Sequence, residues 1–143
     1  MAKISNEAAR NSLNTINSLL NAGGAATIEV YTGNVPATAE TSTGTSPIAT
    51  LTMSEPAFAG ATDNIANNRA EMAAGQGGYE IADDTSAAGA GAPTYVRLVA
   101  GNGNPVAQLT AAVAGSAEVN FAAEISIGSS VSISSLTMIQ SEI

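Results

Sequence analysis

Acidic and glycine-rich segments are the parts of this sequence whose residue types could do chemistry. Asp83 and Asp84, with Glu80 just before them, form the densest acidic cluster, and closely spaced carboxylates can bind calcium. The cluster lacks the D-x-D-x-D-G spacing of a calcium loop, so we interpret it as a solvated turn and predict no metal site. The glycine-rich segments 75–78 and 101–104 complete neither phosphate-loop motif. Both are predicted to be turns, and no cofactor is expected.

The residue inventory argues against catalysis. The 143 residues include no histidine and no cysteine, which removes Ser-His-Asp and Cys-His nucleophiles and the usual soft metal ligands. A serine nucleophile would have only Lys3 or a carboxylate as its base. Paired carboxylates of a glycosidase are compatible with the sequence, but two Phe, three Tyr and no Trp leave few aromatic platforms for a sugar. We expect no enzyme and no catalytic residue, and keep a small hydrolase as a weaker alternative.

The charge balance argues against binding to nucleic acid. Twelve acidic residues face four basic ones, giving a net charge of −8 at pH 7. The basic residues are Lys3, Arg10, Arg69 and Arg97. Counterion release needs several cations along one surface, and these four are scattered along the chain.

The sequence gives no sign of membrane insertion or secretion. No stretch has the roughly 20 consecutive apolar residues of a membrane-spanning helix, and the polar N-terminal segment 1–7 lacks the apolar run of a secretory signal. We therefore expect a soluble protein made in the cytoplasm, with no membrane partner.

The apolar residues are mostly small. They make up 45 % of the chain, but aromatic residues only 3 %. An aromatic side chain buries about 150–250 Å², so a core built almost without them is thin. The length suits one globular domain. A partner that binds only the folded chain would add stability by mass action, which favours a subunit of an assembly.

The N-terminal segment predicts an amphipathic helix over residues 5–21. Ser5 is a suitable N-cap, and the glycine pair 23–24 can adopt the left-handed conformation that ends a helix. The apolar stripe, at spacings of four, three and four, is Ala9, Leu13, Ile16 and Leu20. The opposite face is rich in Asn, which propagates a helix poorly, so packing of the stripe must stabilise it. We assign residues 1–24 to an N-terminal helical arm, with Leu13, Ile16 and Leu20 as candidate interface residues.

After the helix the apolar period changes to two, which predicts strands. The expected strands are 27–32, 49–53, 79–81, 95–99, 105–109, 117–121 and 131–138. The turn 101–104 predicts a hairpin, and a slip of the apolar phase at 134–135 predicts a β-bulge. Segment 63–72 fits a short helix or an irregular strand. We therefore predict a mainly β fold, an antiparallel β-sandwich or Greek-key barrel over residues 25–143, with an N-terminal amphipathic α-helix.

Three residues on the predicted strands point away from the apolar face. Arg97 is either a solvent-facing charge that discourages edge pairing or a salt-bridge donor to another subunit. Tyr31 and Tyr95 are candidate contact residues, because interfaces favour tyrosine. The alternative for both tyrosines is packing of the sheet beneath the helix.

The order of these features resembles a group of small virion proteins of tailed phages. The segments that carry the resemblance are LLNAGG at 19–24, IEVYTG at 28–33, PATAE at 36–40, LTMSEPAF at 51–58, YVR at 95–97, GNGNPV at 101–106 and VSI at 131–133. The likeness runs nearly end to end and rests on order and spacing. The group has a larger aromatic residue just before the strand of Arg97 and fewer Ala and Gly over 59–78, where this chain departs from it.

The resemblance implies a structural virion protein. The best fit is a decoration or cement protein on the capsid surface, which binds the major capsid protein and copies of itself, as a homotrimer, and stabilises the head lattice. A second hypothesis is a head-spike or tail-associated adhesion module that binds the host surface through loops 37–47 and 86–93.

Overall fold

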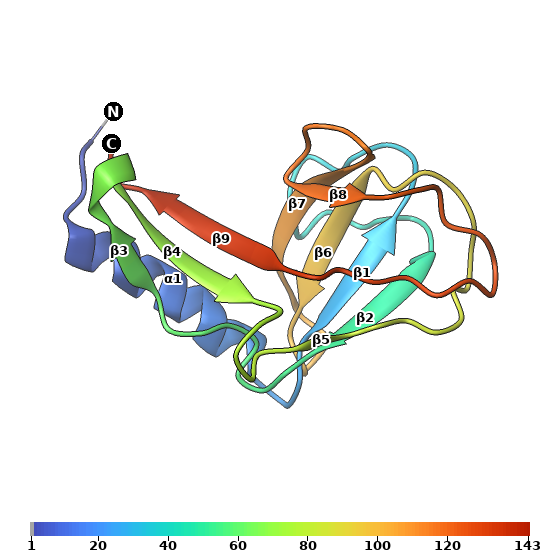
Figure 1. Cartoon of the computed structure of the whole chain (residues 1–143), viewed down its shortest axis with the longest axis horizontal. Helices are drawn as coiled ribbons and strands as arrows, with labels where there is room; N and C mark the ends of the chain where they lie inside the picture. The colour runs from blue at the N-terminus through green and yellow to red at the C-terminus, as the bar shows by residue number, and fades with distance from the viewer. Residues whose placement is uncertain (1) are drawn as a thin grey trace.

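The computed structural model describes residues 2–143, which form one helix and two β-sheets (Figure 1). The elements are α1 (Asn6–Leu20), β1 (Thr27–Tyr31), β2 (Ala49–Met53), β3 (Thr62–Asn64), the 3₁₀ turn η1 (Ile65–Asn67), β4 (Arg69–Ala74), β5 (Ile81–Ala82), β6 (Tyr95–Val99), β7 (Pro105–Val113), β8 (Val119–Phe121) and β9 (Leu136–Ser141). The larger, curled sheet has the order β5-β2-β1-β6-β7-β8, and the smaller sheet has the order β3-β4-β9. The prediction of a mainly β fold with an N-terminal helix is confirmed. Within residues 2–143, no helix has the length and apolar character needed to cross a bilayer.

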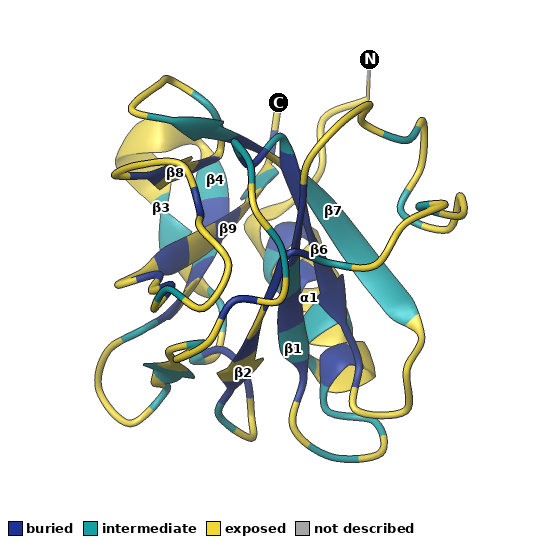
Figure 2. Cartoon of the chain, turned by 90° about the vertical axis from the view of Figure 1, so that its right-hand side faces the viewer, coloured by how far each residue is buried: buried dark blue, intermediate teal, exposed yellow. Residues whose placement is uncertain are grey.

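One apolar core connects the helix with both sheets. The buried face of α1 consists of Ala9, Leu13 and Leu20, and the helix packs against the smaller sheet. The core continues through the inward side chains of β1, β2 and β6, and β6 is buried along its whole length (Figure 2). The residues assigned to a helical arm are thus folded onto the β-strands in a single structure.

Hydrogen bonds at both ends fix the position of α1. At its start, Ser5 Oγ accepts a hydrogen bond from Ala8 N at 3.1 Å, as expected of an N-cap. At its end, the carbonyls of Leu20 and Ala22 accept from Gly101 N and Asn102 N at 3.3 and 2.8 Å. The turn between β6 and β7 therefore satisfies carbonyls that a helix end leaves free.

The Asn-rich face of the helix has a tertiary role. Its side chains bind the backbone of segment 57–61, which runs beside the helix. The bonds are Ala61 N to Asn14 Oδ1 (3.0 Å), Phe58 N to Asn17 Oδ1 (3.1 Å), Asn17 Nδ2 to Phe58 O (2.9 Å) and Ala57 N to Asn21 Oδ1 (3.0 Å). The Asn residues, which propagate an isolated helix poorly, therefore hold segment 57–61 against the helix.

The central strands are antiparallel, and the predicted hairpin is among them. β1 lies antiparallel between β2 and β6, and β6 and β7 form the expected hairpin. β8, however, runs parallel to β7, so the larger sheet is mixed. The short connection is held by Glu118, whose Oε1 accepts from Thr110 N at 3.0 Å and whose N donates to Thr110 Oγ1 at 3.3 Å. These bonds stabilise a short connection after which β8 runs in the same direction as β7. Parallel strands usually need a much longer crossover.

Segment 63–72, which the sequence left open, lies in a hairpin of β3 and β4. The two strands pair antiparallel around η1, and Asn68 takes the left-handed conformation with φ 51°. The ends of the described chain meet beside this turn: Ile4 N donates to Glu142 O at 3.1 Å, and Glu142 N donates to Asn68 O at 2.9 Å. Figure 1 shows both termini at this end of the smaller sheet.

The predicted bulge at 134–135 is wrong, because the chain changes sheets there. Val131 pairs with Asp84 in an isolated bridge, whereas β9 pairs with β4 in the smaller sheet. Residues 132–135 form no strand and carry the chain across. The apolar phase slips because the residues before and after the crossing face the core from different sheets. Gly75 allows the crossing, since a Cβ at this position would collide with the carbonyl oxygen of Ser134.

Gly75→Ala is expected to destabilise the domain by about 2–5 kcal/mol. The positive φ accounts for about 1–2 kcal/mol and overpacking at the crossing for about 1–3 kcal/mol more. Gly78→Ala is the matched control: Gly78 also has a positive φ, but beyond its chain neighbours no atom lies within 4 Å of the place that an added methyl group would take. Urea unfolding measures both free energies, and equal losses would contradict a tight crossing at Gly75.

Candidate functional site

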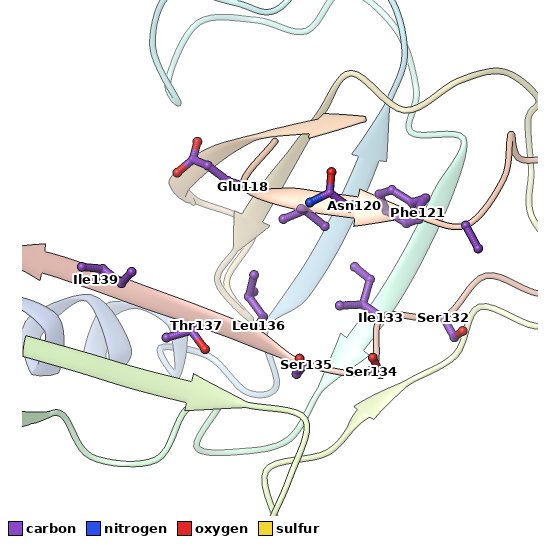
Figure 3. Close-up of a pocket in the computed structure, with 12 residues that line it drawn as sticks. Glu118, Asn120, Phe121, Ser132, Ile133, Ser134, Ser135, Leu136, Thr137 and Ile139 are labelled. Carbon is purple, nitrogen blue, oxygen red and sulfur yellow. The ribbon is translucent and has the colours of Figure 1, made fainter. Parts of the chain in front are cut away.

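A groove separates the two sheets where their outer strands face each other (Figure 3). Its main part has a volume of about 610 Å³ and is lined by Glu118, Val119, Asn120, Phe121, Ala122, Ser132, Ile133, Ser134, Ser135, Leu136, Thr137 and Ile139. Hollows of about 180 and 290 Å³ share residues with it and extend it toward Glu124 and toward Leu109. We call this continuous depression, with residues 118–125, 129–139 and Leu109, the seam groove.

Both walls of the seam groove are strand edges. β8 ends the larger sheet and β9 ends the smaller one, so neither strand has a second neighbour within residues 2–143. Across the groove, β8 and the segment leading into β9 run in opposite directions (Figure 3). The sheets therefore approach each other here without joining.

Backbone groups point into the seam groove from β8 and β9. On β8, Phe121 O accepts from Ala114 N on the β7 side, so the alternating groups of Asn120 point outward. Next to β9, Glu142 N donates to Asn68 O, at the turn before β4. Ala73, which lies opposite Thr137 on β4, instead accepts from Ala59 N on the other side of β4. By the same alternation, the N–H and C=O of Thr137 and Ile139 point away from β4.

The crossing segment adds further free backbone groups. Within residues 2–143, the backbone N–H and C=O of residues 132–135 make no hydrogen bond. A backbone polar group without a protein partner must bind water or another molecule. The crossing thus adds backbone groups without a protein partner beside the seam groove, and one of them, Ser134 O, lies against Gly75.

The floor of the seam groove is apolar and its rim is polar. Val119, Phe121, Ile133 and Leu136 are buried. Figure 3 shows Ile133, in the crossing, and Leu136, at the start of β9, pointing toward β8. The exposed rim contains Asn120, Ser132, Ser134 and Thr137, while Ile139 is 49 % exposed. A molecule in the groove would therefore meet an apolar floor between polar margins.

The edge of the seam groove formed by segment 132–139 lacks charged residues and proline, whereas the β8 edge is only three residues long. Natural proteins blunt exposed edges with charged residues or proline. Here no charged residue lies between Glu124 and Glu142, and no proline follows Pro105. The charged side chains of the groove are Glu118 and Glu124, both acidic.

A second polar cluster lies on the outer face of β1, β6 and β7, beneath loop 36–45. The rings of Tyr31 and Tyr95 stack with centroids 4.9 Å apart, and the Arg97 guanidinium lies 5.9 Å from the centroid of Tyr95. Arg97 Nε donates to Gln108 Oε1 at 3.0 Å, and its Nη2 donates to the carbonyls of Thr38 and Thr41. The cluster anchors the loop to the sheet.

Three predicted interface residues lie on the outer face of the sheet as expected, but loop 36–45 covers them. Tyr31, Tyr95 and Arg97 are buried, and Arg97 is only 6 % exposed. Arg97 is therefore not a solvent-facing charge, and its Nε and Nη2 donors bind Gln108 and two loop carbonyls of the same chain. The tyrosines pack beneath loop 36–45 and not beneath the helix. The polar loop folds back because its carbonyls satisfy the guanidinium.

Burial changes the acid–base behaviour of the two tyrosines. It raises the pKa of Tyr31 to about 12, and the hydrogen bond from its hydroxyl to Glu29 Oε2 at 3.0 Å acts in the same direction. Burial also raises the pKa of Tyr95. Both shifts arise because the stacked rings are withdrawn from solvent beneath loop 36–45.

The predicted interface residues of the helix lie away from the seam groove. Leu13 and Leu20 are buried in the core, and Ile16 packs partly buried against it. None of the six predicted interface residues lines the groove. The sequence signal for it is the uncharged, proline-free run 125–141, with the phase slip at 134–135 inside it.

The acidic cluster does not form the predicted turn: its residues flank β5, and Asp84 pairs with Val131 in an isolated bridge. Asp84 Oδ2 accepts from Thr50 N at 2.9 Å, and Oδ1 accepts from Ser86 N at 3.0 Å. Over the described residues 2–143, no three acidic side chains come together in a way that could hold a metal ion.

No protein family model, no curated protein and no solved structure matches this chain.

Arg97→Leu is expected to destabilise the domain by about 2–4 kcal/mol, because it leaves Gln108 and two loop carbonyls without their charged donor. Hydrogen exchange in loop 36–45 should become faster. Arg69→Leu is the control, since this residue pairs with Glu71 at the surface, and its loss should cost at most about 1 kcal/mol. Equal losses in the unfolding free energy would contradict the anchoring role.

Alkaline pH should destabilise the domain through Tyr31. The neutral phenol is favoured in the folded state, since its pKa is raised from 10.0 to about 12. This contribution is complete below about pH 10 and is lost as the pH rises toward about 12. Tyr31→Phe should therefore lose less unfolding free energy than the wild type across this window. Parallel losses in urea unfolding series would show that Tyr31 is not responsible.

Proposed function

We propose that this chain is a non-enzymatic structural protein that binds other proteins of a larger assembly through the seam groove. We further propose that the assembly is the head of a tailed phage, where the chain decorates and stabilises the capsid lattice. The observation that carries the first proposal is the pair of open strand edges facing each other. The end-to-end resemblance to tailed-phage virion proteins supports the second.

The energetics of the domain favour stabilisation by a partner. Its core is mostly aliphatic, with Phe58 and Phe121 as the buried phenylalanines. A partner in the seam groove would cover Ile139 and supply hydrogen bonds to backbone groups now left to water. Because such a partner binds only the folded chain, it would raise the free energy of unfolding by mass action. The same binding energy would link neighbouring subunits of a lattice.

Copies of the chain would meet through a different surface in the proposed homotrimer. Ile65 and Ile143 are 74 % and 63 % exposed, and both lie near Ile4, at the end where the termini meet. Exposed apolar side chains gathered in one place are typical of contact surfaces. We assign this apolar end to self-association and the seam groove to the major capsid protein.

A head-spike or tail-associated adhesion module is the second candidate. The observation in its favour is the anchoring of loop 36–45 by Arg97, which presents an ordered, Thr-rich and Ser-rich surface. An ordered loop loses less conformational entropy on binding a host receptor. In this role, loops 37–47 and 86–93 would contact the host surface. Binding of the isolated protein to host cells or glycans tests it.

Virions assembled without this chain should lose infectivity faster on heating or in low salt than complete virions. Supplying the wild-type chain in trans is the control and should restore resistance. Equal inactivation rates would contradict the cement role. Antibody labelling in electron microscopy separates the two candidates: label over the head surface supports decoration, and label on spikes or tails supports adhesion.

A further inference from the structure

We infer that the occupant of the seam groove is an extended strand from a different protein, with alternate apolar side chains and basic residues near its ends. The strand would pair with β8 on one side and with the 132–139 segment on the other, joining the two sheets. This inference rests on the proposed function in one respect: the protein that supplies the strand is taken to belong to the same assembly.

The walls of the groove favour a strand over a helix. A helix satisfies its own backbone groups internally, so it would leave those of Asn120, Thr137, Ile139 and the crossing without protein partners. An extended segment offers N–H and C=O groups on both sides and can pair with two edges at once. Since the two edges run in opposite directions (Figure 3), the guest would be antiparallel to one and parallel to the other.

The floor of the groove determines the side-chain pattern of the guest. Successive side chains of a strand point to opposite faces. One set would lie on the apolar floor formed by Val119, Phe121, Ile133 and Leu136, and the other would face solvent. The guest is therefore expected to alternate apolar and polar residues over about the length of segment 132–139.

Charge distinguishes a different protein from a second copy. Glu118 and Glu124 lie toward opposite ends of the groove, and no basic residue lines it. Pairing two copies edge to edge through these grooves would bring like charges together in chains of net charge −8. A guest with basic ends would instead complement Glu124 and the negative charge of Glu118, whose Oε1 already accepts from Thr110 N.

A peptide-binding experiment on the full chain tests the inference. The probe is a fluorescein-labelled peptide of eight alternating valine and threonine residues with a lysine at each end, followed by fluorescence anisotropy. One control peptide has proline at every threonine position, which removes those N–H donors, and another has glutamate at each end. The lysine peptide should bind at least about ten-fold more tightly than either control.

Variants of the chain locate the binding. Thr137→Pro removes a donor that points into the groove, and proline is tolerated at such an edge position. It should weaken binding of the lysine peptide about ten-fold or more, whereas Thr137→Val should not. Glu124→Lys changes an exposed carboxylate and should shift the preference from the lysine peptide toward the glutamate peptide. Urea unfolding of each variant confirms that the domain is folded.

Several results would overturn the inference. These are failure of the lysine peptide to bind at millimolar concentration, equal binding of the proline peptide, and no effect of Thr137→Pro in a folded chain. Self-association that Thr137→Pro abolishes, measured by analytical ultracentrifugation, would identify a second copy as the occupant and also overturn it. The virion experiment is separate: peptide binding with unchanged virion stability would reject the cement role and leave the strand inference standing.

Discussion

Backbone hydrogen bonding determines how the two sheets of this domain share one core. Each N–H and C=O must find a partner, and regular strands provide it only where they have neighbours. At residues 132–135 the chain leaves the region of the larger sheet and enters the smaller one, passing over Gly75, where a side chain would collide. The crossing joins the sheets covalently, yet its own backbone stays without a protein partner. The seam groove is a direct consequence of this crossing.

The smaller sheet depends on the helix for its place in the structure. α1 covers this sheet with its apolar stripe, while Asn14, Asn17 and Asn21 bind the segment that leads into β3. The helix is in turn capped by the β6–β7 turn. Helix, hairpin turn and smaller sheet thus support one another.

The Arg97 cluster compensates for the scarcity of large side chains. The stacked tyrosines and the guanidinium form a second packed layer on the outer face of the larger sheet, and loop 36–45 covers them. β6 is consequently buried on both faces. A buried cation is tolerated because loop carbonyls and Gln108 satisfy its donors.

The sequence by itself determined the elements whose signals are local: the capped helix, the strands of period two near residues 28, 51 and 97, and the hairpin around its glycine-asparagine turn. Composition alone removed histidine and cysteine chemistry. Only the tertiary structure decided the β3–β4 hairpin, the parallel direction of β8, the burial of Arg97 and the change of sheets at 132–135. Each of these depends on which distant segment covers a face or pairs with an edge, and periodicity within one segment carries no information about that partner. The seam groove belongs to this second group, because it exists only where two edges distant in the fold come to face each other.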